Sequence, residues 1–188
     1  MKAYRTFILG AALAVGQAMA QSHTQVCTFE DPGQSSRVTP FSLPWMNAET
    51  TGTAYSSASH ANGIFVVEAY FLGCPYCNDN APNVNDLTDK YASSDRVQVL
   101  DVGVDRSDAD YEEWIRKHQP NHPVLKDAQR VLIKQLGTTG YPSTYVVDCK
   151  GNVVYKTSGV WNSAKKAAIH KAVDTLLAVD CHSAPALY

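Results

Sequence analysis

A Cys-x-x-Cys pair placed between a strand-like segment and a helix-like segment constrains this chain more than any other feature. Residues 64–71 are apolar on both faces apart from one Glu, which is typical of a central strand in a parallel sheet. The motif C-P-Y-C at 74–77 follows closely, and apolar residues then recur at helical spacing over 78–91. Since proline is favoured at the first helical position, we expect Cys74 to cap this helix and Pro75 to begin it.

The remaining segments predict further strands and helices in a fixed order. We expect a short hairpin of 41–43 with 53–55, a second strand at 97–104, and two helices at 108–119 and 128–136. Another hairpin of 144–148 with 153–157 and a final helix at 163–177 would follow. We expect Asp108 and Ser163 to be the N-caps of their helices. A parallel strand pair closed by an antiparallel hairpin gives a mixed central sheet with helices on both faces, a three-layer α/β sandwich.

The first twenty residues are typical of a secretory signal peptide. Lys2 and Arg5 precede an apolar run at 7–15, and an A-x-A cleavage site stands at 18–20. The apolar run is too short to span a bilayer, and a short buried helix is the alternative interpretation. We therefore expect a mature chain that begins at Gln21, is periplasmic or secreted, and does not stay inserted in a membrane after cleavage.

Beyond the signal peptide at 1–20, three parts are expected: an irregular extension at 21–40, one folded domain at 41–182 and a tail at 183–188. The chain has 45% hydrophobic residues, with 16 Lys and Arg against 18 Asp and Glu. Cleavage of the signal would remove two of the basic residues and leave the rest more acidic. No basic patch for nucleic acid is indicated, which favours proteins or small molecules as partners.

All five cysteines lie beyond the signal peptide. They are Cys27, Cys74, Cys77, Cys149 and Cys181. An odd number in an exported protein leaves at least one thiol free, or paired transiently or with another chain. Because the chain has a single C-x-x-C and no second pair at ligand spacing, a structural zinc site is poorly supported, and we expect neither a metal nor an organic cofactor.

The strand-to-helix junction predicts thiol chemistry. The N-terminus of the helix would favour a thiolate at Cys74, and Cys77 would lie one turn further on, where it can attack a mixed disulfide. An inert disulfide or a metal site is the alternative. Glu68, a carboxyl group in an apolar strand, is expected to have a raised pKa that suits it to exchange a proton with Cys77. A Glu at the sheet edge whose head reaches water is the other possibility.

A second polar segment, Thr-Thr-Gly-Tyr-Pro-Ser-Thr at 138–144, precedes a strand far downstream. A tight turn of this kind is where cis X-Pro bonds concentrate, and a cis Pro142 would leave the backbone of Tyr141 facing an incoming chain. An ordinary trans proline would be preferred on this segment alone. In combination with the strand order and the C-P-Y-C motif, we expect the cis form.

These features together resemble the thioredoxin fold. The strand, C-x-x-C and helix with Pro82, the G-Y-P-S-T turn, and the V-V-D-C-K-G-N-V-V hairpin with Gly159 beyond it occur in the right order over about 41–178. The preceding P-F-S-L-P segment and the signal peptide resemble the secreted TlpA/redoxin-like branch. Its members act as periplasmic thiol-disulfide oxidoreductases.

The resemblance implies roles for individual residues. Cys74 would be the nucleophile, Cys77 the resolving cysteine, Glu68 the buried acid and Pro142 the cis-proline. Asp101 falls where many thioredoxins carry a Lys facing the buried acid, and an inward Asp101 would raise the pKa of that acid further. Gly73 replaces the usual Trp, and C-P-Y-C is the motif associated with glutaredoxins.

The expected activity is therefore exchange of disulfides with protein thiol or disulfide substrates, together with an unidentified redox partner. A thiol peroxidase is one alternative, although it normally carries a lone Cys at T-x-x-C spacing. A copper-handling thioredoxin-like chaperone is another, with a downstream His as a further ligand. His118, His122 and His170 are the possible ligands, but we expect each to be exposed or to cap a helix.

The topology also predicts a structural disulfide between Cys149 and Cys181. The strand after Pro142 runs away from the C-P-Y-C end and reaches Cys149 at the hairpin, and the final helix returns to that same end before Cys181. Cys27 is the competing partner for either sulfur.

Overall fold

The computed structural model describes residues 37–180, so the expected signal peptide and the tail lie outside the described residues. A five-stranded sheet forms the centre, in the order β5-β4-β3-β6-β7. Its strands are β3 (Ile64–Tyr70), β4 (Val97–Gly103), β5 (Val124–Lys126), β6 (Ser143–Val147) and β7 (Val153–Ser158). The central β3 pairs in parallel with β4 and antiparallel with β6, which confirms the predicted mixed sheet.

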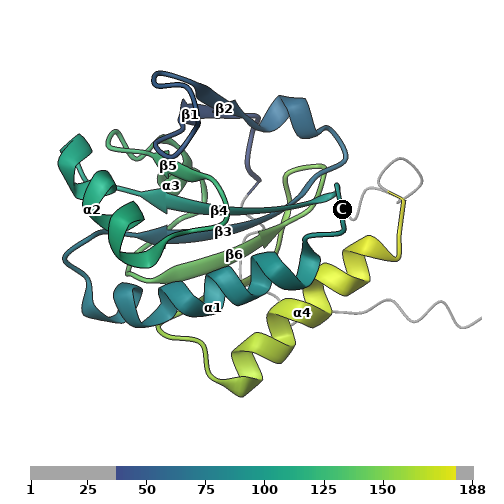
Figure 1. Cartoon of the computed structure of the whole chain (residues 1–188). Helices are drawn as coiled ribbons and strands as arrows, with labels where there is room; N and C mark the ends of the chain where they lie inside the picture. The colour runs from purple at the N-terminus through teal and green to yellow at the C-terminus, as the bar shows by residue number, and fades with distance from the viewer. Residues whose placement is uncertain (1–36, 181–188) are drawn as a thin grey trace, which may run out of the picture.

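The two faces of β3 are covered by different elements. Ile64 and Val66 pack under α1 (Pro75–Tyr91) and α4 (Ser163–Leu177), which lie along one face in Figure 1. The alternate residues Phe65 and Val67 pack against α3 (Val131–Gln135) and the hairpin of β1 (Ser42–Pro44) and β2 (Ala54–Ser56). Helices thus cover both faces, as the sequence predicts, and within the described residues none of them has the length and apolar character to cross a bilayer.

The remaining helices complete the two layers. The helix α2 (Asp108–His118) packs beside the N-terminal end of α1, where Tyr111 and Trp114 meet Tyr70 at the end of β3. A short 3₁₀ helix, η1 (Ser57–His60), follows β2. Site residues on β3 and at the start of α1 therefore lie between α2 and α4.

Several local predictions are wrong by small shifts. The N-caps are Ser107 and Asn162, so Asp108 and Ser163 are instead the first residues of their helices. Asn162 Oδ1 accepts from the Lys165 amide at 2.9 Å and is the better-placed cap. The sequence interpretation also missed β5, because a three-residue edge strand beside a proline has too little periodicity to detect.

The end of the predicted irregular extension is tied to the β6–β7 turn. Arg37 forms a bridge with Asn152, and the Val38 amide donates to the Gly151 carbonyl at 2.7 Å. Gly151 has a φ of +88°, and a Cβ there would clash with the Val38 carbonyl oxygen. A glycine is therefore required where the entering chain crosses the hairpin.

Candidate active site

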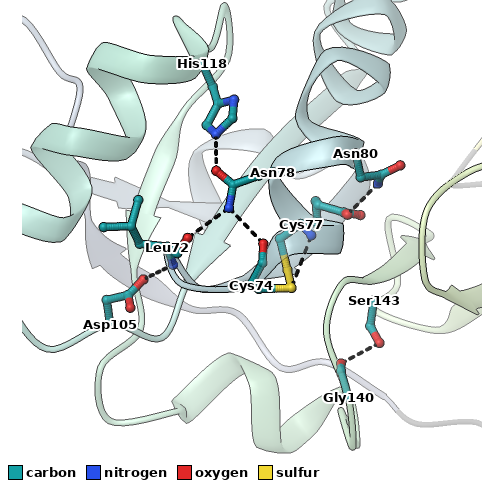
Figure 2. Close-up of a disulfide and its surroundings, with 10 residues drawn as sticks. Leu72, Cys74, Cys77, Asn78, Asn80, Asp105, His118, Gly140 and Ser143 are labelled. Carbon is teal, nitrogen blue, oxygen red and sulfur yellow. Dashed lines mark hydrogen bonds between the residues drawn. A yellow bond between two sulfur atoms is a disulfide. The ribbon is translucent and has the colours of Figure 1, made fainter.

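The two cysteines of C-P-Y-C stand at the start of α1, as predicted. Cys74 is the N-cap and Pro75 begins the helix, and the Cys77 amide donates to Cys74 Sγ at 3.1 Å (Figure 2). A disulfide joins Cys74 to Cys77, with the Cα atoms 5.2 Å apart. The helix N-terminus would stabilise a thiolate at Cys74 in the reduced form, because its unpaired amides and dipole favour negative charge.

Exposure does not separate the two sulfurs in the oxidised form. Cys74 is 3% exposed and Cys77 is 2% exposed. Tyr76 between them is 64% exposed and forms the outer surface of the motif. What distinguishes the cysteines is position, since Cys74 is the N-cap of α1 and Cys77 lies inside its first turn.

Asn78 fixes the loop that carries Cys74. Its Nδ2 donates to the carbonyls of Leu72 at 2.9 Å and Cys74 at 2.8 Å, and its Oδ1 contacts His118 Nε2 on α2 (Figure 2). Lys117 Nζ of the same helix also donates to Oδ1. The sequence interpretation missed this residue. The adjacent C-P-Y-C motif did not reveal it because the contacts with α2 span about forty residues of sequence.

Glu68 lies buried in the middle of β3, only 3% exposed. Asn80 Nδ2 donates to Oε1 at 2.7 Å, and Thr144 Oγ1 donates to Oε2 at 2.6 Å. Burial raises the pKa of Glu68 to about 8, the two hydrogen bonds lower it in part, and the charge of Asp101 adds to the rise. The predicted raised pKa is confirmed, and the alternative of a Glu reaching water is wrong.

Trp161, which the sequence interpretation did not single out, holds both partners of Glu68. Its Nε1 donates to Thr144 Oγ1 at 2.7 Å, and its backbone amide donates to Asn80 Oδ1 at 2.9 Å. The amide of Asn80 is thereby oriented with its nitrogen toward Glu68. The carboxyl group therefore sits in a fixed polar pocket inside an apolar layer.

Asp101 faces inward beside Glu68. The two residues are direct partners across the parallel pair β3–β4, and Asp101 is 2% exposed. Its Oδ2 accepts from Trp114 Nε1 at 2.9 Å, and its Oδ1 lies 3.3 Å from His122 Nε2. Two inward acids on neighbouring strands thus share one interior region.

The expectation that His122 is exposed or caps a helix is wrong. It is 6% exposed and paired with Asp101, because the loop before β5 folds under α1. His118 is half-buried against the ring of Trp114, and His170 is half-buried near Tyr91. Neither of these two is exposed or caps its helix, so the expectation is wrong for them as well.

The Tyr141–Pro142 peptide bond is cis, as predicted. Ser143 Oγ donates to the Gly140 carbonyl at 2.8 Å and closes this turn, which lies near the disulfide in Figure 2. The Tyr141 ring meets Phe71 edge to face, with the ring centres 5.5 Å apart. Tyr141 and Phe71 pack against the buried cluster that contains both cysteines, so the turn belongs to the same site.

Cys149 directly follows Asp148 at the turn after β6, and it is disulfide-bonded. The expected partner Cys181 and the competitor Cys27 lie outside the described residues, so the pairing stays a prediction.

Two proteins similar to this chain are named thiol-disulfide oxidoreductases. The thiol-disulfide oxidoreductase YkuV of Bacillus subtilis is 25% identical over 120 residues, which cover 61% of this chain and 77% of YkuV. ResA of Bacillus cereus, also named a thiol-disulfide oxidoreductase, is 24% identical over 86 residues, 46% of this chain and 49% of ResA. The chain thus matches about half the length of ResA.

Solved structures share the fold. A thiol:disulfide interchange protein of the thioredoxin family from Chlorobium tepidum superposes with a TM-score of 0.62 at 22% identity, over 78% of this chain and 99% of that one. StoA from Bacillus subtilis gives a TM-score of 0.59 at 16% identity, over 72% and 96%. The thioredoxin fold expected from the sequence is confirmed. Because the model of the AhpC/TSA family also matches residues 35–156, well over half of the chain, the protein belongs to the AhpC/TSA family.

Proposed function

We propose that the protein is an exported thiol-disulfide oxidoreductase that exchanges disulfides with protein substrates through Cys74 and Cys77. The observation that carries the proposal is the placement of this pair at the N-terminus of α1, beside the turn of Pro142. The names of YkuV and ResA, both thiol-disulfide oxidoreductases, support it.

The first step makes a mixed disulfide. The Cys74 thiolate, stabilised at the helix N-terminus, attacks one sulfur of a substrate disulfide. The substrate S–S bond breaks, a Cys74–substrate disulfide forms, and the released substrate thiolate takes a proton from water. The surface formed by Phe71, Leu72 and Tyr141 would receive the substrate chain, with the backbone beside Pro142 as its hydrogen-bonding edge.

The second step closes the internal disulfide. The Cys77 thiol gives its proton to the Glu68 carboxylate, and the new thiolate attacks Cys74 Sγ. The Cys74–substrate bond breaks, the Cys74–Cys77 disulfide forms, and the second substrate thiolate leaves, so two electrons have passed to the substrate. In the reverse direction Glu68 returns its proton to Cys77. Its pKa of about 8 leaves both protonation states accessible near neutral pH.

Export is the part of the proposal that rests on the sequence at 1–20. Export would place the reaction in an oxidising compartment, where a redox partner would regenerate the reduced dithiol or the disulfide. Fractionation of cells that express the full chain tests it. We expect a shortened protein that begins at Gln21 in the periplasm or medium.

Trapping of mixed disulfides tests the chemistry. We expect Cys77→Ser to accumulate covalent complexes with protein substrates through Cys74, whereas the matched Cys74→Ser should trap none. Both variants keep the helix start, so circular dichroism should show the same fold. Equal trapping by the two variants would refute the order of the cysteines, and no trapping by either, without insulin reduction by the wild type, would reject the function.

A further inference from the structure

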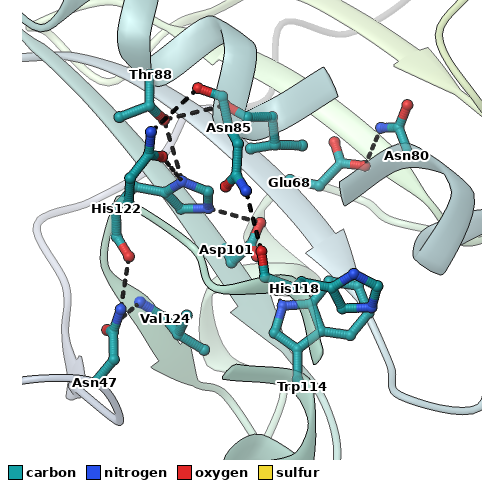
Figure 3. Close-up of polar contacts among 12 residues, drawn as sticks. Asn47, Glu68, Asn80, Asn85, Thr88, Asp101, Trp114, His118, His122 and Val124 are labelled. Atoms are coloured by element: carbon teal, nitrogen blue, oxygen red, sulfur yellow. Dashed lines mark hydrogen bonds and ion pairs between the residues drawn. The ribbon is translucent and has the colours of Figure 1, made fainter. Parts of the chain in front are cut away.

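Asp101 and His122 lie against each other in the interior, behind the active site. His122 Nε2 lies 3.3 Å from Asp101 Oδ1, and each side chain is only 2% exposed (Figure 3). Asp101 belongs to β4, whereas His122 lies in the loop just before β5. A charged pair with so little contact with water needs specific partners to hold it.

The hydrogen bonds around His122 determine where its protons lie. Asn121 Nδ2 donates to Asp89 Oδ1 at 2.8 Å, so Asn121 Oδ1 is the atom that faces His122 Nδ1, at 3.2 Å. Thr88 Oγ1, 3.1 Å from Nδ1, already donates its own proton to the Val84 carbonyl. Both neighbours are acceptors, so Nδ1 carries a proton.

The second ring nitrogen and Asp101 Oδ1 face each other, and neither has a hydrogen-bond partner among the described residues. Nε2 of His122 faces a carboxylate oxygen of Asp101, and a carboxylate can only accept. This geometry suits a charged pair, in which an imidazolium at His122 donates to the carboxylate of Asp101.

The pair is held from several sides. Trp114 Nε1 donates to Asp101 Oδ2 at 2.9 Å. Asn47 Nδ2 donates to the His122 carbonyl at 2.8 Å, and Asn47 Oδ1 accepts from the Val124 amide at 2.8 Å (Figure 3). The loop that carries His122 is thus fixed to the segment after β1 and to β5.

This ion pair adjoins Glu68. Glu68 and Asp101 are partners across β3 and β4, so their side chains leave the same face of the sheet. The groups facing Glu68 from the other elements, Asn80 of α1 and Thr144 of β6, are uncharged. Asp101 is also faced by Tyr70 at the end of β3 and by His118 of α2.

We propose that His122 is a positioning residue for the dithiol reaction: paired with Asp101, it fixes the charge beside Glu68 and so sets the pH at which Glu68 exchanges its proton. The inference rests on the proposed function, in which Glu68 exchanges a proton with Cys77. The physical reason is Coulombic. A bare carboxylate beside Glu68 would oppose its ionisation, and an imidazolium at His122 would offset much of that charge.

The two members of the pair therefore predict opposite effects. His122→Gln keeps a polar side chain and removes the cation. Deprotonation of the second acid of the Glu68–Asp101 pair should therefore occur at a pH about 1 unit higher than in the wild type. Asp101→Asn keeps an acceptor for Trp114 and removes the anion, so Glu68 should titrate at lower pH than in the wild type. A merely structural pair would not give shifts of opposite sign.

Carbon-13 NMR of glutamate-labelled oxidised protein measures this titration without any turnover. The chain has only five Glu residues, and Glu68→Gln identifies the signal of Glu68 by its loss. His170→Gln is the matched control, because His170 lies on α4 near Tyr91, and it should leave the titration of Glu68 unchanged.

An upward shift in His122→Gln together with a downward shift in Asp101→Asn supports the proposal. No shift in either variant, or shifts of the same sign, would overturn it. If His122→Gln fails to fold, Asp101→Asn decides alone, and an unchanged or raised titration of Glu68 rejects the idea. Because the readout needs no substrate, failure of the proposed function would show separately, in the trapping experiment.

Discussion

Asn78 Nδ2 donates to the carbonyl oxygen of Cys74 at 2.8 Å, so the residue that follows the C-P-Y-C motif holds the first cysteine of that motif. The same nitrogen donates to the Leu72 carbonyl, and Asp105 Oδ2 accepts from the Leu72 amide at 2.9 Å. The loop between β3 and α1 is therefore fixed from both sides. Its geometry does not depend on the disulfide alone.

Replacing Asn78 should loosen this loop. Asn78→Ala removes two hydrogen bonds to partly buried carbonyls, and we expect the free energy of unfolding of the oxidised protein to fall by about 1–3 kcal/mol. Urea unfolding measures the difference. Asp86→Ala, at an exposed position of the same helix, is the control and should change the stability by less than about 0.5 kcal/mol. Equal stability of Asn78→Ala and the wild type would show that these hydrogen bonds contribute nothing to the free energy of unfolding.

The sequence predicted the parts of the site that depend on neighbouring residues. The apolar strand around Glu68 and the proline after Cys74 have local signatures, because burial and capping act over one element. The cis form of Pro142 is a different case, because it was expected only from this segment in combination with the strand order and the C-P-Y-C motif. At Glu68 and Cys74, by contrast, the residue types within a few positions determine the conformation.

The parts it missed depend on contacts between distant segments. His122 pairs with Asp101 only because the loop before β5 folds beneath α1, and nothing near either residue indicates it. Trp161 likewise reaches Thr144 and Asn80 from beyond β7. The caps failed differently: Ser107 and Asn162 stand next to Asp108 and Ser163, and all four residue types are good N-caps.

Glu68 should give the closing of the internal disulfide its pH dependence. Only the ionised carboxylate can accept the proton of Cys77, and its population rises as the pH passes through about 8. The rate at which the reduced protein is oxidised by a peptide disulfide should therefore increase across this range. Glu68→Gln should be slower and lose that dependence. Glu49→Gln, at an exposed position, is the control and should keep the wild-type profile.

The same carboxyl group should make the stability depend on pH. Its pKa is raised in the folded state from 4.5 to about 8, so the folded protein binds more protons than the unfolded chain between these values. The stabilisation is complete below about pH 4.5 and is lost as the pH rises through about 8. Relative to Glu68→Gln, the wild type should lose about 3–5 kcal/mol of unfolding free energy over this window. Parallel stability curves for the two proteins would contradict the assignment.

Within the described residues, Cys149 and the end of α4 both lie near His60 and Ala61. Arg96 donates to the carbonyls of Leu177 at 3.2 Å and Val179 at 3.1 Å, which ties the end of α4 and the chain after it to the residue just before β4. Residues 177–180 line a cavity together with His60 and Ala61. The same two residues also line a neighbouring cavity of about 550 Å³ that contains Cys149.

We therefore predict that Cys149 pairs with Cys181, the residue directly after this stretch. In the chain-entropy model a loop of this length would stabilise the fold by about 3–4 kcal/mol. Peptide mapping of the oxidised protein without reductant should recover a linked pair of peptides that contain Cys149 and Cys181. Cys27→Ser is the control and should leave both that link and the thermal stability unchanged. A link from Cys27 to either residue, or alkylation of both Cys149 and Cys181 in oxidised protein, would reject the pairing, because each outcome leaves the predicted bond unformed.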